Sequence, residues 1–167
     1  CGQIALERAG IKVDNYLASE VDEYAMKITQ KNYPNTIQLG DIRNVNIKKL
    51  PKIDLLIGGS NCQGFSFAGR GLNFDDPRSL LFFEYVRILD DLKESNPDIN
   101  FLFENVKMKK ESLDIITKKL GVVKPALINS CDFSAQKRER YYWANFPIYK
   151  RHEKGIPLKI KDIMFQS

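Results

Sequence analysis

The chain has 167 residues, 43% of them apolar, and a formal net charge of +5, so it is long enough to bury a core and short enough for one domain. No run approaches the ~18 apolar residues that a membrane-spanning helix requires, and no charged segment followed by an apolar one opens the sequence, so we expect neither a membrane span nor a signal peptide. Its three cysteines, Cys1, Cys62 and Cys131, form no C-x-x-C pair, which argues against disulfides or a zinc site and favours reduced thiols in the cytoplasm.

The first third of the chain predicts short elements that alternate between helix and strand. Helices are predicted at residues 3–9 and 21–32, and strands at residues 16–19, 36–39 and 53–57. The chain enters its first helix with no strand before it, whereas a parallel sheet of this kind begins with a strand that feeds a glycine-bearing turn. We therefore expect the first strand of the sheet to be missing.

The remainder of the chain continues this alternation. Residues 78–93 carry apolar side chains at helical spacing and predict an amphipathic helix, and residues 112–120 predict a second helix that Gly121 closes. Strands are predicted at residues 99–103, 126–129 and 141–146. Alternating strands and helices are typical of an α/β domain with a largely parallel sheet.

The basic residues are concentrated at the C-terminal end. Residues 137–167 contain eight Lys and Arg against three Asp and Glu, so the whole net charge of +5 belongs to this segment. Such an excess indicates contact with a polyanion such as nucleic acid, and a solvated basic tail is the alternative interpretation.

A candidate nucleophile follows the third predicted strand. Cys62 lies in the sequence GGSNCQGFS, residues 58–66, directly after the strand at residues 53–57. Open α/β sheets bind ligands at the carboxyl ends of their strands, and the small or polar neighbours of Cys62 leave its thiol reachable. A cysteine buried as a small apolar side chain is the alternative, and the local sequence does not separate the two.

One polar residue follows each of four successive predicted strands: Glu20, Asp41, Cys62 and Glu104. The carboxyl ends of parallel strands share one edge of a sheet, so we expect these residues to share a site. Acidic residues at the first two of these positions are suited to ribose hydroxyls and to an adenine amino group, so Glu20 and Asp41 indicate an adenosine-containing cofactor. The alternative is that each caps the next helix.

Four motifs occur in a fixed order along the chain: GSNCQ at residues 59–63, DDPRS at 75–79 with LFF at 81–83, ENV at 104–106, and QKRER at 136–140. In these motifs, and over nearly its full length, the chain resembles the DNA cytosine-5 methyltransferases of bacteria and phages and the catalytic domains of the vertebrate de novo enzymes. Each motif is weak by itself, whereas the ordered combination is specific.

The resemblance implies a Rossmann-like sheet of the S-adenosylmethionine-dependent methyltransferases. Residues 1–150 would form the catalytic and cofactor-binding core, and residues 151–167 would begin a basic target-recognition region. The family's first strand would precede Cys1, and a continuation after Ser167 or a partner would supply the rest of the recognition region.

The resemblance also implies methylation of C5 of cytosine in double-stranded DNA, with the base flipped out of the stack. Cys62 would add to C6 as a thiolate, and Glu104 would hydrogen-bond the N3 and N4 edge of the ring while sharing a proton with it. Arg140, with Arg138 as the second candidate, would contact O2. No metal is required for this chemistry.

Two further sets of residues follow from the resemblance. For S-adenosylmethionine, these are Cys1 and Gly2 beside the carboxylate, Glu20 at the ribose, Asp41 and Ile42 at the adenine, and Val21, Asn61 and Leu81 as additional lining. For DNA, they are Ser66 and Arg70 in a loop that closes over the base, together with Gln136 and Arg138.

The chain departs from the family at Asn61, where the family has proline. Proline would restrict φ and supply no N–H, so Asn61 makes the turn before Cys62 less rigid. A non-catalytic module that binds nucleic acid or a partner is therefore one alternative, and a transfer-RNA cytosine-5 methyltransferase, from a branch of the same family, is another. A nicotinamide dehydrogenase is disfavoured because no G-x-G-x-x-G sequence occurs.

Overall fold

The computed structural model describes residues 2–60, 77–132 and 134–148. The chain divides into two compact units, residues 1–51 and residues 52–167. Each unit has a sheet of its own, with two strands in the first unit and four in the second. No helix in the described ranges is long and apolar enough to span a membrane.

The first unit is small and its sheet is parallel. Its elements are α1 (Gly2–Arg8), β1 (Leu17–Ala18), α2 (Glu23–Asn32), β2 (Ile37–Gln38) and the 3-10 helices η1 (Ile42–Asn44) and η2 (Ile47–Lys49). Gly10, with a φ of 70°, lets the chain turn after α1. Asp22 starts α2, because its Oδ1 accepts hydrogen bonds from the backbone N–H groups of Tyr24 and Ala25 at 2.8 and 2.9 Å.

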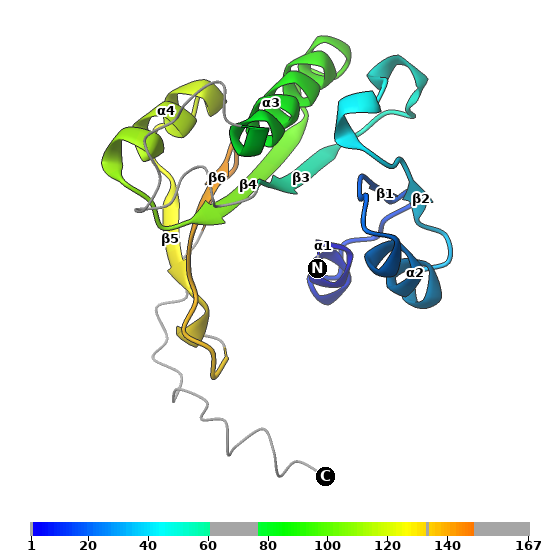
Figure 1. Cartoon of the computed structure of the whole chain (residues 1–167), viewed down its shortest axis with the longest axis horizontal. Coiled ribbons are helices and arrows are strands. Elements are labelled where there is room, and N and C mark those ends of the chain that lie inside the picture. The colour runs from blue at the N-terminus through cyan, green and yellow to red at the C-terminus, as the bar shows by residue number, and fades with distance from the viewer. Residues whose placement is uncertain (1, 61–76, 133, 149–167) are drawn as a thin grey trace. The chain divides into compact units, whose positions relative to one another are not determined.

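The second unit is a mixed four-stranded sheet with two helices (Figure 1). Its elements are β3 (Leu55–Gly59), α3 (Pro77–Ser95), β4 (Asn100–Val106), α4 (Lys110–Leu120), β5 (Ala126–Asn129), the 3-10 helix η4 (Ser130–Asp132) and β6 (Glu139–Ala144). The strand order is β3-β4-β6-β5. Strands β3 and β4 are parallel, whereas β6 is antiparallel to both β4 and β5.

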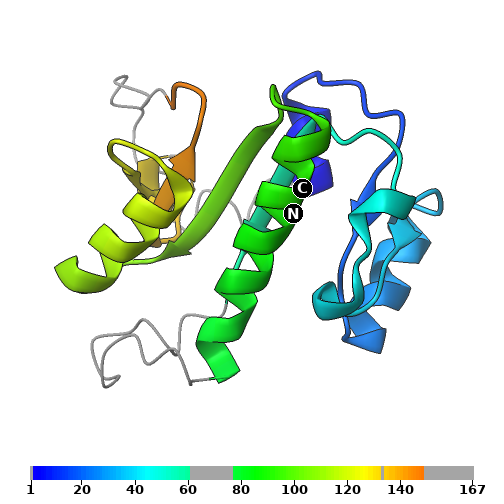
Figure 2. The same ribbon diagram turned by 90° about the horizontal axis from the view of Figure 1, so that it is seen from above.

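The core of this unit lies on one face of the sheet. Phe103 of β4 and Trp143 of β6 are cross-strand partners, and both are fully buried. The ring of Tyr85 in α3 lies 4.8 Å from that of Phe103, and Trp143 Nε1 donates a hydrogen bond to Thr117 Oγ1 in α4 at 2.9 Å. Helices α3 and α4 therefore cover the same face of the sheet, and Figure 2 shows the unit from above.

The opposite face carries the polar side chains of the second unit. Because side chains alternate along a strand, Glu104 projects from the face that Phe103 does not use. On β6, Arg140 and Tyr142 project from that same face, since Tyr142 is the cross-strand partner of Glu104. One face of the sheet is thus packed against α3 and α4, and the opposite face carries Glu104, Arg140 and Tyr142.

Each helix and strand predicted from the sequence is present, and the α/β class is confirmed. One expectation about Glu104 is wrong, because this residue does not follow its strand. Strand β4 continues to Val106 rather than ending at Phe103. The reason is pairing on both sides: β3 pairs with β4 as far as Glu104, and β6 pairs with it as far as Val106.

Candidate active site

The end of β3 packs closely against its neighbours, most tightly at Gly58. A Cβ atom on Gly58 would lie 2.5 Å from Cδ2 of Tyr85 in α3. On Gly59, it would lie 3.0 Å from the backbone oxygen of Glu104 and 3.3 Å from Oε2 of the same residue. The two glycines therefore let β3 approach α3 and β4 closely, and they bring the chain that leads to Cys62 against Glu104.

The parallel pairing of β3 with β4 determines which residues meet at their carboxyl ends. Gly59 is the register partner of Glu104, and one residue further on, Asn105 Nδ2 donates a hydrogen bond to Ser60 Oγ at 3.0 Å. Cys62 follows Ser60 by two residues and lies outside the described ranges. The segment that leads to the predicted nucleophile thus leaves the sheet beside Glu104.

Two arginines lie near Glu104, one from β6 and one from the turn before it. Arg140 Nε lies 2.9 Å from Glu104 Oε1, and Arg138 Nη2 lies 3.8 Å from the same oxygen. The side chain of Arg140 is 19% exposed, against 49% for Arg138. Because a shorter and less exposed pair is screened less by water, Arg140 is the stronger partner of Glu104. The structure thus brings together three residues that the sequence predicted for one site.

Strand register explains why Arg140 reaches Glu104. In the antiparallel pairing of β4 with β6, Arg140 lies opposite Val106, two residues beyond Glu104 on the same face. Diagonal neighbours of this kind are within reach of long side chains. Oε1 of Glu104 therefore faces Arg140, whereas Oε2 is the atom of this carboxylate nearest to Gly59.

A hydrogen-bonded turn precedes β6 and positions Arg138. Asn129 Oδ1 accepts a hydrogen bond from the backbone N–H of Arg138 at 3.0 Å. Ser130 Oγ donates to the backbone oxygen of Gln136 at 2.6 Å. The side chain of Gln136 is exposed next to this turn, so the QKRER sequence presents one polar and two basic side chains from a rigid support.

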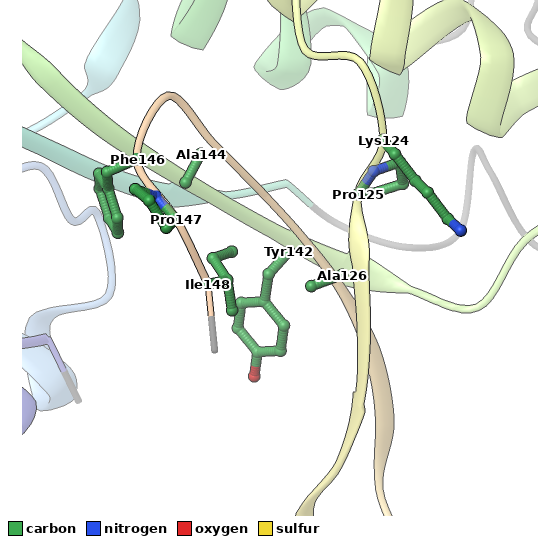
Figure 3. Close-up of a pocket in the computed structure, with 8 residues that line it drawn as sticks. All are labelled: Lys124, Pro125, Ala126, Tyr142, Ala144, Phe146, Pro147 and Ile148. Atoms are coloured by element: carbon green, nitrogen blue, oxygen red, sulfur yellow. The ribbon is translucent and has the colours of Figure 1, made fainter. Parts of the chain in front are cut away.

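A pocket of about 360 Å³ opens on the same face of the sheet (Figure 3). It is lined by Lys124, Pro125, Ala126, Tyr142, Ala144, Phe146, Pro147 and Ile148. Burial, and then the negative charge of Glu104, raise the pKa of the Tyr142 phenol, so this side chain is neutral at ordinary pH. Sequence analysis missed Tyr142, because only the strand register places it beside Glu104.

In the first unit, Glu20 and Asp41 follow the two parallel strands β1 and β2, and so lie at the same edge of that sheet. Oε1 of Glu20 accepts hydrogen bonds from the backbone N–H groups of Val21 and Asp22 at 2.8 and 3.0 Å. The residue that caps α2 is Asp22 rather than Glu20, so the helix-capping alternative is wrong for Glu20.

For Asp41, the capping alternative is confirmed, because this residue is the N-cap of η1. Its Oδ1 accepts a hydrogen bond from the backbone N–H of Arg43 at 2.9 Å, and the guanidinium of Arg43 lies against both carboxylate oxygens. The Arg43 side chain, followed by its backbone N–H, lowers the pKa of Asp41 to about 2. Arg43 thus occupies about the four hydrogen bonds that a carboxylate accepts, so a ligand group at Asp41 would have to replace one of these contacts.

Replacement of Arg43 by alanine is expected to raise the pKa of Asp41 from about 2 toward its ordinary value of 3.8. The value stays below 3.8, because the backbone N–H of residue 43 still donates. Folding lowers the pKa of Asp41, so the ionised carboxylate stabilises the folded protein. This contribution is fully present above about pH 4 and is lost as the pH falls through about 2. An NMR titration of the Asp41 carboxyl carbon measures both values, and an unchanged pKa in the variant would contradict the assignment.

The other predicted residues are distributed over both units and the undescribed segments. Of those described, Gly2 begins α1, Val21 is exposed before α2, Ile42 begins η1, and Leu81 is half-buried in α3. Five lie outside the described ranges: Cys1, Asn61, Cys62, Ser66 and Arg70. Within the described ranges, no three His, Cys, Asp or Glu side chains are grouped so that they could hold a metal ion.

Comparison with known sequences finds a family and relatives. The family described as C-5 cytosine-specific DNA methylase matches residues 1–158. The orphan methyltransferase M.SPRI of Bacillus phage SPR is 36% identical over 176 residues, which cover 97% of this chain and 39% of the phage protein. The type II methyltransferase M1.ScrFI of Lactococcus lactis subsp. cremoris is 39% identical over 145 residues, which cover 81% of this chain and 36% of that protein.

Comparison with solved structures finds the same fold. The crystal structure of S. pombe Dnmt2 methyltransferase matches with a TM-score of 0.66 and 22% sequence identity, over 98% of this chain and 51% of that chain. The chain therefore spans about half the length of that structure and less than half the length of the phage and Lactococcus proteins.

Proposed function

We propose, from the premise that the chain belongs to the C-5 cytosine-specific DNA methylase family, that the protein transfers a methyl group from S-adenosylmethionine to C5 of cytosine in DNA. The observation that carries the proposal is the junction of β3, β4 and β6. There Gly59 lies beside Glu104, and Arg140 Nε lies 2.9 Å from Oε1 of that glutamate. A carboxyl group and a guanidinium thus meet beside the end of β3, the strand that precedes Cys62 in the sequence.

These three groups match the chemistry that cytosine requires. C5 is a poor nucleophile until an electron pair is added to C6. In the proposed reaction, the Cys62 thiolate forms a bond to C6, the double bond shifts from C5–C6 to C4–C5, and N3 takes the proton that Glu104 and the base share. Once C5 has gained the methyl group that S-adenosylmethionine would supply, N3 would return its proton to Glu104. Loss of the C5 proton to solvent would then restore the C5–C6 double bond as the C6–S bond breaks and the thiolate is released.

The geometry of Glu104 supports this role. Arg140 contacts Oε1, while Oε2 lies 3.3 Å from the position that a Cβ atom on Gly59 would take. Arg140 uses Nε in this ion pair, and its Nη1 donates to the backbone oxygen of Glu139 at 2.8 Å. The remaining N–H groups of the guanidinium are proposed to donate to O2 of the base. Negative charge develops on the cytosine ring as the Cys62 thiolate adds to C6. Hydrogen-bond donors of Arg140 and Glu104 that are already oriented would stabilise this charge.

The residues of the first unit fit S-adenosylmethionine, which supplies the electrophilic methyl group when it is bound. Glu20 uses Oε1 for two backbone N–H groups, and Oε2 has no partner within the described ranges, so this oxygen is available to ribose hydroxyls. Asp41 is ionised, and it is proposed to accept from an adenine amino group in place of one of its contacts with Arg43. Ser19 Oγ donates to the backbone oxygen of Gly40 at 2.6 Å and so links the loops that carry the two acids.

The substrate in this proposal is double-stranded DNA with the target base flipped out. Unstacking a base costs a few kcal/mol, and contacts with phosphates offset this cost. Arg138 supports such a contact, because its side chain is largely exposed and 3.8 Å from Glu104. Arg70, Ser66, Gln136 and the basic residues after 150 are proposed to contribute further contacts, in the cytoplasm of a bacterial or phage-infected cell.

Covalent trapping tests the proposed function. The complete gene product is expected to form a stable adduct with duplex DNA that contains 5-fluorocytosine, because fluorine at C5 cannot leave as a proton. A Cys62→Ser variant is expected to form none, and an adduct that persists in this variant would reject Cys62 as the nucleophile. Cys131→Ser is the matched control and is expected to trap DNA as the parent does.

Two further measurements separate the alternatives. Calorimetry of the complete gene product with S-adenosylmethionine is expected to show binding, and no binding would favour the non-catalytic module. A side-by-side assay on duplex DNA and transfer RNA decides the substrate, since methylation of the RNA alone would replace the DNA assignment.

A further inference from the structure

Asn105 is a buried polar side chain that the proposed reaction does not use. It is only 2% exposed. Its Nδ2 donates to Ser60 Oγ at 3.0 Å and approaches the backbone oxygen of Ser60 at 3.5 Å. Its Oδ1 accepts a hydrogen bond from the backbone N–H of Val106 at 2.8 Å. The amide nitrogen is therefore directed at one residue, Ser60, and the hydrogen bond that the amide oxygen accepts holds the amide in that orientation.

Ser60 is the point at which the chain leaves the sheet. Strand β3 ends at Gly59, whose partner is Glu104, so the ladder does not hold Ser60. The side chain of Asn105 supplies the restraint instead, at both Oγ and the backbone oxygen. Asn61 follows, and unlike proline it does not restrict φ. The restraint at Ser60 is thus the nearest one to Cys62 in the described part of the chain.

We propose that Asn105 is a positioning residue that orients the nucleophile loop through Ser60. The proposal rests on the proposed function, in which Cys62 is the nucleophile. Cys62 is two residues from Ser60, a reach of at most about 7 Å, so the direction in which the chain leaves Ser60 limits where the thiol can lie. Productive attack requires the sulfur to lie within about 3–3.5 Å of C6, and small displacements are costly.

The chain offers a matched control for the loss of this contact. Asn96 Nδ2 donates a hydrogen bond to the backbone oxygen of Ile53 at 2.9 Å. Ile53 lies two residues before the first residue of β3, at the opposite end of this strand from Ser60. Asn96→Ala therefore removes an amide hydrogen bond beside the same strand, far along it from Ser60. Ser60→Thr is the conservative variant, because it keeps an Oγ atom that can accept from Asn105.

The first readout is the single-turnover rate of adduct formation with 5-fluorocytosine DNA in the complete gene product. Ser60→Ala and Asn105→Ala are each expected to slow this step about tenfold. The double variant should be no slower than the slower single variant, because both substitutions break the same contact. Ser60→Thr is expected to stay within about twofold of the parent. Full additivity of the two losses would overturn the proposal.

The second readout does not depend on catalysis. Iodoacetamide alkylation of Cys62 is measured by mass spectrometry relative to Cys131 in the same molecule. Release of the loop is expected to raise this ratio about threefold in Ser60→Ala and Asn105→Ala and to leave it unchanged in Asn96→Ala. An unchanged ratio in Ser60→Ala, or an equal rise in Asn96→Ala, would overturn the positioning role. A parent that forms no adduct rejects the proposed function, and the alkylation ratio then decides this inference alone.

Discussion

Replacing Arg140 with alanine is expected to lower kcat for methyl transfer about 100-fold or more, the usual cost of losing a donor that stabilises developing charge. Arg140 lies 2.9 Å from Glu104 and is largely shielded from solvent. Without it, the carboxyl group loses its orientation and O2 of the base loses a donor. Steady-state rates at saturating DNA and S-adenosylmethionine measure the effect.

Arg138→Ala is the matched control for this prediction. Arg138 lies 3.8 Å from the same oxygen and its side chain is half exposed, so its loss is expected to lower kcat less than about tenfold and mainly to raise KM for DNA. Arg140→Lys should recover little, because a lysine cannot reproduce the guanidinium geometry. Equal losses of kcat in the two alanine variants would contradict the distinct roles assigned to these residues.

Gly58→Ala is expected to lower the free energy of unfolding by about 2–3 kcal/mol, which is typical of overpacking in a core. The added methyl group would lie 2.5 Å from the ring of Tyr85. That ring is itself packed against Phe103 at 4.8 Å and is 4% exposed, so it has little room to move away. Urea denaturation of parent and variant measures the difference.

A double-mutant cycle with Tyr85 tests the cause. In a Tyr85→Ala background the clash is absent, so adding Gly58→Ala is expected to cost less than about 1 kcal/mol. The same cost in both backgrounds would show that the ring of Tyr85 is not what excludes a side chain at position 58.

Much of the fold followed from local patterns. The helix at residues 78–93 and the strand at residues 126–129 were predicted close to their observed bounds, because apolar spacing and glycine or proline boundaries act over a few residues. The strand that contains Glu104 was predicted too short, since pairing with β3 and β6 extends it and no local signal reports those partners.

Local sequence did not identify the residue that caps α2, and the capping alternative for Glu20 is wrong. Glu20 and Asp22 are both acidic residues near the start of α2, and only the backbone geometry selects Asp22 as the residue that accepts from Tyr24 and Ala25. Asp41, in contrast, caps the element that follows it directly. The difference arises because capping depends on which backbone N–H groups point at the carboxylate.

The sequence by itself determined which chemical groups are present and in what order: a thiol in a glycine-rich loop, a carboxyl group in the ENV motif and the arginines of the QKRER motif. Their order alone carried the resemblance to the family that residues 1–158 match. Only the tertiary structure decided that Arg140 rather than Arg138 holds Glu104 and that Asn105 holds Ser60. Both facts depend on strand register, and a shift of one residue would turn these side chains to the opposite face of the sheet.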